Sequence, residues 1–119
     1  MAIQIFGTSK CFDTKKAERW FSERNISVQK IDLKQKGISK GELESVVAAL
    51  TQKLGSKDDV IEALINTKSK DYASIAYLAD EDKLEKLLEQ PALLVTPIVR
   101  NGKTAATVGF CPDTWKTWN

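Results

Sequence analysis

The segment Ile3-Gln4-Ile5-Phe6-Gly7-Thr8-Ser9-Lys10-Cys11 joins a short apolar strand, through a polar loop, to the start of a helix. A helix N-terminus carries unpaired N–H groups and the positive end of the helix dipole, so it stabilises an anion. A cysteine at this junction is therefore placed to react as a thiolate, and Lys10 adds positive charge beside it. A free cysteine is most often a small buried hydrophobic side chain. The polar residues around Cys11 favour the reactive interpretation.

The composition predicts one domain over residues 1–119 and excludes several kinds of chemistry. The fractions of 42% hydrophobic and 29% charged residues are those of a soluble globular protein, without an apolar run long enough for a membrane span. Two cysteines are too few for a disulfide-stapled secreted domain, so we expect a cytoplasmic protein. The net charge of +2 does not favour direct nucleic-acid binding. With no histidine, Cys–His pairs, Ser–His–Asp triads and ordinary zinc sites are excluded, so we expect no metal.

The first part of the chain predicts a strand, a helix and a second strand. Apolar side chains at helical spacing indicate a helix over 14–24, and alternation indicates a strand over 26–31. Two strands joined by one helix are expected to be parallel, with a right-handed crossover. Ser39 and Glu42 then form a capping box that opens a helical block over about 39–90.

The last part of the chain predicts a hairpin and a short helix. The run 93–100 is strand-like, Asn101-Gly102 is a strong turn signal, and 103–108 is the return strand. Pro112 opens the final helix. Because a central strand tolerates proline badly, Pro97 marks an edge, a bulge or a cis peptide. The order β-α-β, a helical insertion and β-β-α is a thioredoxin-like α/β pattern.

Several motifs together make the chain resemble the ArsC/Spx/YffB family, the arsenate-reductase-like branch of thioredoxin-fold proteins. They are Ile5-Phe6-Gly7 leading to Cys11-Phe12-Asp13-Thr14-Lys15-Lys16-Ala17, then Gly37-Ile38-Ser39, Thr96-Pro97-Ile98-Val99 and Gly109-Phe110. The resemblance implies a thioredoxin-like core with the block at about 39–90 inserted between its halves. It also implies a redox or nucleophilic role for Cys11 and a cis Pro97 facing it.

The chain departs from the arsenate-reducing members of that family in its arginines. Those members surround the cysteine with arginines, because a multiply charged oxyanion needs fixed donors. One such arginine precedes the cis proline, where this chain has Thr96, and Arg100 is the arginine left in this region. We therefore disfavour arsenate as the substrate.

The family also contains redox-responsive regulators of the Spx type, which bind RNA polymerase without being enzymes. These usually carry a Cys-x-x-Cys switch, whereas here Thr14 occupies the fourth position after Cys11. A single thiol instead suits a mixed disulfide with a small thiol such as glutathione, resolved by an external thiol or a glutaredoxin-type reductant. We expect no bound cofactor, with glutathione as a possible co-substrate. The thiol oxidoreductase is the leading hypothesis and the regulator is the alternative.

The resemblance and the local chemistry together give a set of expected site residues. Cys11 is the nucleophile, and Lys10 and Thr14 stabilise its thiolate. For Thr14, the other interpretation is an ordinary residue of the first helical turn. For substrate binding we expect Thr96, Pro97 and Arg100.

Cys111 is a candidate resolving thiol. It precedes Pro112, so it is expected at the N-cap of the last helix, a position that favours a thiolate. The family geometry places this segment on the same side as Cys11, with the two Cα atoms on the order of 10 Å apart, whereas a disulfide needs about 7 Å or less. The other interpretation is a cysteine that only fills a small site under the last helix.

Overall fold

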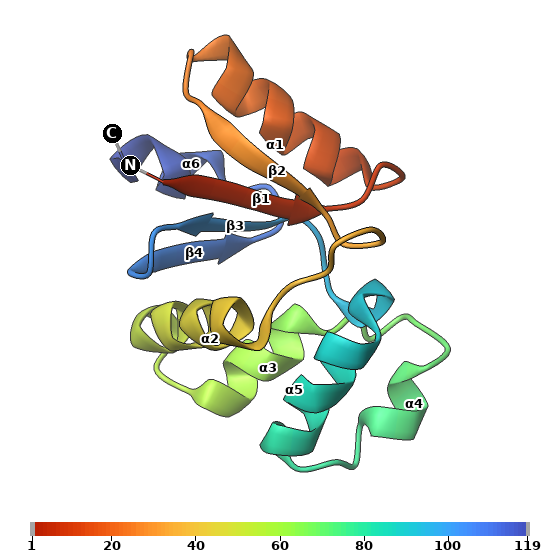
Figure 1. Ribbon diagram of the computed structural model, residues 1–119. Coiled ribbons are helices and arrows are strands. Elements are labelled where there is room, and N and C mark those ends of the chain that lie inside the picture. Colours follow the sequence, from red (N-terminus) through yellow and green to blue (C-terminus); the bar gives the residue numbers. More distant parts are fainter. Residues whose placement is uncertain (1, 119) are drawn as a thin grey trace.

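The computed structural model describes residues 2–118, and its centre is a four-stranded sheet in the order β2-β1-β3-β4 (Figure 1). The strand β1 pairs in parallel with β2, with Ile3 opposite Val28, and antiparallel with β3, which also pairs antiparallel with β4. The helix α1 connects β1 to β2, so the predicted β-α-β unit and the thioredoxin-like fold class are confirmed. The bounds of these elements are β1 Ile3–Gly7, α1 Phe12–Glu23, β2 Val28–Asp32, β3 Ile98–Asn101 and β4 Ala105–Val108.

Helices cover both faces of the sheet (Figure 1), and each face packs into its own hydrophobic cluster. Alternation along β1 sends Ile3 and Ile5 to the face that carries α1 and α6, where they pack with Phe21 and Trp115. Phe6 points to the other face, into the cluster built with the helical insertion. The sheet is therefore buried on both sides.

The insertion contains four helices, α2 Lys40–Leu54, α3 Lys57–Leu64, α4 Tyr72–Ile75 and α5 Asp80–Glu89. The predicted capping box is present, because the Ser39 hydroxyl accepts from the Glu42 N–H and the Glu42 carboxylate accepts from the Ser39 N–H. Gly55 ends α2 with a φ of 84°, a left-handed conformation that favours glycine. Ser56 then caps α3 by accepting from the Asp59 N–H.

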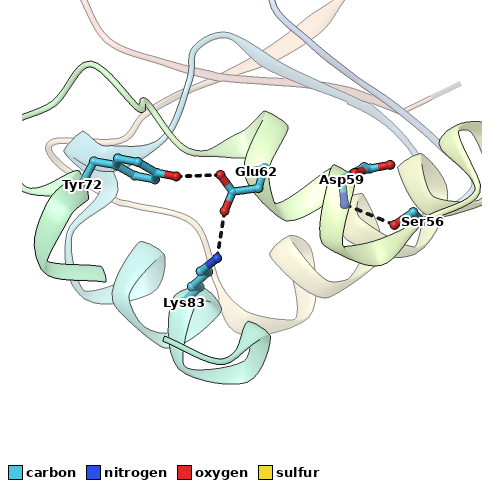
Figure 2. A network of polar contacts seen from close by, with 5 residues as sticks. All are labelled: Ser56, Asp59, Glu62, Tyr72 and Lys83. Carbon is cyan, nitrogen blue, oxygen red and sulfur yellow. Dashed lines mark hydrogen bonds and ion pairs between the residues drawn. The ribbon is translucent and has the colours of Figure 1, made fainter. Parts of the chain in front are cut away.

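A polar network holds the last three helices of the insertion together (Figure 2). The Glu62 carboxylate on α3 accepts a 2.9 Å hydrogen bond from the Tyr72 hydroxyl on α4. It also forms a 2.8 Å ion pair with Lys83 on α5. The Lys83 side chain is only 12% exposed, so this pair is better shielded from water than an ordinary surface salt bridge.

The structure corrects two predictions in the second half of the chain. The strand predicted over 93–100 begins only at Ile98, because the preceding residues bond to the insertion: Leu94 forms an isolated bridge with Ile65, and the Val95 N–H donates to Leu64. Residues 91–93 form a 3₁₀ turn, η1 Pro91–Leu93. The hairpin loop also has three residues, 102–104, because Asn101 still pairs with Ala105.

The chain ends with α6 Pro112–Trp115 and a 3₁₀ turn, η2 Lys116–Trp118. The fully buried Trp115 holds this end on the sheet, where its indole N–H donates a 2.8 Å hydrogen bond to the Thr107 hydroxyl. In residues 2–118, none of the helices combines the length and the apolar character that a bilayer crossing requires.

Candidate active site around Cys11

Cys11 is the N-cap of α1, directly beyond the carboxyl end of β1. Its backbone N–H donates to the Thr8 carbonyl at 3.2 Å, which closes the connecting loop. Its thiol donates to the Thr96 carbonyl, with a sulfur–oxygen distance of 3.6 Å. The half-buried thiol is therefore held between the start of a helix and the residue that precedes Pro97.

Hydrogen bonding lowers the pKa of the Cys11 thiol. Burial is the largest single influence and opposes ionisation, but donors from the Thr14 and Thr96 side chains and from the N–H groups of Thr14 and Asp13 together outweigh it. These N–H groups belong to the first turn of α1 and receive no side-chain cap from Cys11 in its thiol form. The site therefore favours the thiolate, the reactive form of cysteine.

Thr14 is a buried polar residue whose side chain lies next to the Cys11 sulfur. It is only 4% exposed, and its hydroxyl oxygen has no hydrogen-bond partner within residues 2–118. A buried hydroxyl without a partner is costly, so it needs an explanation. The thiolate supplies one, because an ionised Cys11 accepts the hydrogen bond that the thiol form leaves unmade.

Gly7 leaves the room that Thr14 occupies. A Cβ atom at Gly7 would collide with the Thr14 side chain. The last residue of β1 must therefore be glycine for Thr14 to pack in this position. Gly7, a residue of the sequence motif, therefore affects the reactivity of Cys11 indirectly, through the position of Thr14.

A cleft of about 600 Å³ is lined in part by Thr8 and Thr96, the two residues whose carbonyls accept hydrogen bonds from Cys11. It is shared by the loop after β1, the loop after β2, the insertion and the segment before Pro97. Its lining includes apolar residues such as Leu33 and Leu94 together with polar side chains at its edges. The polar lining side chains are Thr8, Lys34, Asn66, Gln90 and Thr96.

The predicted substrate-binding residues separate into two groups. Thr96 contacts Cys11 and lines the cleft, and the Thr96–Pro97 peptide bond is cis. Arg100 is not part of this site. Its guanidinium donates to the Ser45 hydroxyl at 2.8 Å and to the Gln4 side chain at 2.5 Å. Because residues of β3 alternate between faces, Arg100 shares the α2 face with Ile98.

The structure also changes the roles expected for Lys10 and Cys111. Lys10 is exposed, and within the described part of the chain the donors that lower the Cys11 pKa are hydroxyl and backbone groups, not lysines. Cys111 is indeed an N-cap, but the expectation that this position favours a thiolate is wrong. Burial raises the pKa of its thiol, which donates to the Val108 carbonyl at 3.3 Å. The helix it caps has only four residues, too few to add a substantial dipole.

Cys111 nevertheless lies in the same layer as α1. With Phe110 it packs against the cluster that contains Ala17 and Trp20, and the Lys16 ammonium lies 4.6 Å from the centroid of the Phe110 ring. Both cysteines are free thiols. Pairing between Cys11 and Cys111 stays a prediction.

Sequence reasoning missed the far wall of the cleft. Lys34 lies in the loop after β2, and Asn66 and Gln90 follow helices of the insertion. None of these residues lies in a motif. Only the packing of the insertion against the sheet brings them near Thr96. Within residues 2–118, no group of three or more Cys, Asp or Glu side chains is arranged to hold a metal ion.

The fold and the site define a thioredoxin-like protein with one activated thiol at the N-terminus of its first helix. The sequence model of the ArsC family matches residues 6–118. The chain belongs to the ArsC family.

Three relatives show how widely this architecture is shared. The uncharacterized protein YusI of Bacillus subtilis is 25% identical, over 95% of this chain and 94% of its own length. The solution structure of SACOL0876 from Staphylococcus aureus is 26% identical, with a TM-score of 0.74 and coverage of 97% of this chain and 96% of that one. The arsenate reductase of Vibrio cholerae is 24% identical, with a TM-score of 0.76 and coverage of 96% and 94%. This last similarity shows a common fold, not a common substrate.

Proposed function

We propose that the protein is a thiol-dependent oxidoreductase that uses Cys11 to exchange disulfides with a small peptide thiol such as glutathione. The observation that carries the proposal is the set of donors around the Cys11 sulfur, which lower its pKa. The unpartnered Thr14 hydroxyl beside it is a donor that an inert structural cysteine would not need.

The proposed reaction is two successive thiol–disulfide exchanges. The Cys11 thiolate attacks one sulfur of a substrate disulfide, a new bond forms between Cys11 and that sulfur, and the other sulfur leaves as a thiolate that takes a proton from water. The thiolate of an external reductant, a small thiol or a glutaredoxin-type protein, then attacks the mixed disulfide. This second exchange forms a disulfide between the reductant and the sulfur that Cys11 had bound, and it releases Cys11 as a thiolate. Over both exchanges the substrate disulfide is reduced to a thiol, and the reductant is oxidised to a disulfide.

The cleft supports a peptide-like partner. Among the described residues that line it, Lys34 is the only charged one, so the lining favours a ligand that carries a carboxylate. The amide side chains of Asn66 and Gln90 can both donate to and accept from a peptide backbone. Arsenate is a poor fit, because Arg100 is already engaged with Ser45 and Gln4. The proposal places the protein in a reducing compartment such as the cytoplasm.

The alternative, a regulator that binds RNA polymerase, has less support from the site. A local disulfide switch needs a second cysteine one helical turn after Cys11, and Thr14 stands there. The activated thiol would also have no role in simple binding.

The test is a turnover assay with purified reduced protein, glutathione and a glutathionylated peptide. We expect release of the peptide thiol by the parent protein and by Cys111→Ser, and no release above the uncatalysed rate by Cys11→Ser. Arsenate in the same assay should be reduced far more slowly. Equal rates for the parent protein and Cys11→Ser would refute the proposal, and robust arsenate turnover would overturn its choice of substrate.

A further inference from the structure

A groove of about 810 Å³ runs between α2 and α5. Both helices pack on α3, which lies between them in Figure 1. Its walls carry apolar side chains from both helices, with Leu43 and Val47 on α2 and Leu84 and Leu88 on α5. Leu43 and Val47 are themselves buried, whereas the two α5 leucines are only partly buried. The apolar surface open to an occupant is therefore mainly that of Leu84 and Leu88.

The rim of the groove carries more negative than positive charge. Four carboxylates face two lysines along it, and the Lys57 ammonium is already paired with Glu81 at 3.1 Å. The chain as a whole has a net charge of +2, so this local excess has the opposite sign to the protein. The carboxylates are Glu44, Glu81, Asp82 and Glu85, and the lysines are Lys40 and Lys57.

Negative charge also gathers at the neighbouring N-terminal ends of α3 and α5. The carboxyl groups of Asp58 and Asp80, next in sequence to Lys57 and Glu81, approach each other closely enough to hydrogen-bond. This contact raises the pKa of Asp80. Lys57 and Lys83 already lie close enough to oppose this shift, and neither aspartate lines the groove. The charge that an occupant meets is therefore that of the rim residues.

We propose that this groove binds a basic amphipathic helix of a partner protein, with its apolar side chains on the leucines and its lysines or arginines along the carboxylate rim. An apolar channel bounded by charged edges suits an amphipathic helix, which places anchors at positions i, i+3, i+4 and i+7 in a groove. A third helix would pack on α2 and α5 as helices pack on each other elsewhere, at axial distances of about 8–10 Å.

The length of the groove sets the length of the partner helix. Leu43, Val47 and Thr51 line one wall at intervals of four residues, which extend about 12 Å along α2 at 1.5 Å per residue. A helix of roughly three turns covers that wall. The groove shares no lining residue with the cleft beside Cys11, so occupation of the one does not depend on the chemistry of the other.

The experiment measures binding of two synthetic helical peptides to the full chain by fluorescence anisotropy. Both have 14 residues and the same leucine face, and the polar face is lysine in one and glutamate in the other. We expect the lysine peptide to bind at least about tenfold more tightly at low salt. Because the net charge of the protein favours the glutamate peptide, general attraction predicts the reverse order. Raising the salt to about 1 M should remove most of the preference.

Variants locate the binding. Ala48 is an exposed residue of the groove wall, so Ala48→Arg adds bulk and positive charge without disturbing the core. It should weaken the lysine peptide at least about tenfold, and Glu44→Lys combined with Glu85→Lys should reverse the preference. Glu23→Lys makes the same kind of charge change at the far end of α1 and should leave both affinities unchanged.

Three results would overturn the proposal. They are equal or undetectable binding of the two peptides, binding that Ala48→Arg leaves unaltered, and sedimentation as a dimer that Ala48→Arg dissociates, which would assign the groove to a second copy of the chain. Circular dichroism of each variant checks that it is folded.

Discussion

Replacing Thr14 by valine should make the protein more stable and its cysteine less reactive. The two side chains have nearly the same shape, so the change removes a hydroxyl and little packing. In the thiol state that hydroxyl is buried without a partner, at a cost of about 1–3 kcal/mol. In the thiolate state it donates to the sulfur. The substitution should therefore stabilise the folded protein when Cys11 is a thiol and destabilise it when Cys11 is a thiolate.

The size of each effect follows from the surroundings of the sulfur. A hydrogen bond to a charged group contributes about 1.5–3 kcal/mol, and the lower end applies because Cys11 is half-exposed. Since 1.36 kcal/mol corresponds to one pKa unit, the thiolate population of Thr14→Val should fall roughly tenfold at a pH below the pKa. At a pH below the pKa of Cys11, where the thiol is protonated, the free energy of unfolding should rise by about 1 kcal/mol.

The assay is the rate of iodoacetamide alkylation against pH in a Cys111→Ser background, with urea unfolding of the same proteins. Thr14→Ser keeps the hydroxyl, so it should keep the alkylation profile of the parent while losing some packing. If Thr14→Val is alkylated with an unchanged pH profile, the hydroxyl does not stabilise the thiolate. In that case ionisation of Cys11 does not account for the buried, unpartnered oxygen of Thr14.

Three further predictions concern Gly7, the two cysteines and Glu62. Gly7→Ala should displace Thr14, slow the alkylation of Cys11 at neutral pH about as much as the loss of the hydroxyl does, and lower stability in urea by about 1–3 kcal/mol through overpacking. Below the ordinary thiol pKa of about 8.5, the lowered pKa of Cys11 adds stability as pH rises, whereas above it the raised pKa of Cys111 removes stability as pH rises. Urea unfolding should therefore show Cys11→Ser losing stability relative to the parent protein as pH increases, and Cys111→Ser gaining. Glu62→Ala should cost about 1 kcal/mol at pH 7 by thermal unfolding. The difference from the parent should shrink as pH falls through the lowered pKa of this carboxyl.

The local chemistry of the sequence determined the parts of this protein that depend on a few neighbouring residues. Alternation along β1 placed Ile3 and Ile5 together on one face of the strand, and the Ser39–Glu42 pair fixed the start of α2. Each of these features is set by backbone geometry or by hydrogen bonds that span at most one helical turn. The position of Cys11 at a helix N-terminus was predictable for the same reason.

Only the tertiary structure decided which distant residues meet. Leu94 has the pattern of a strand residue, but it pairs with Ile65 in an isolated bridge, because the connection to the insertion needs partners for its backbone. Arg100 has the right charge for a substrate site, yet Ser45 and Gln4 hold it on the α2 face. The cleft beside Cys11 is assembled from segments far apart in the sequence. A local pattern could not reveal these contacts, because each depends on how the insertion packs against the sheet.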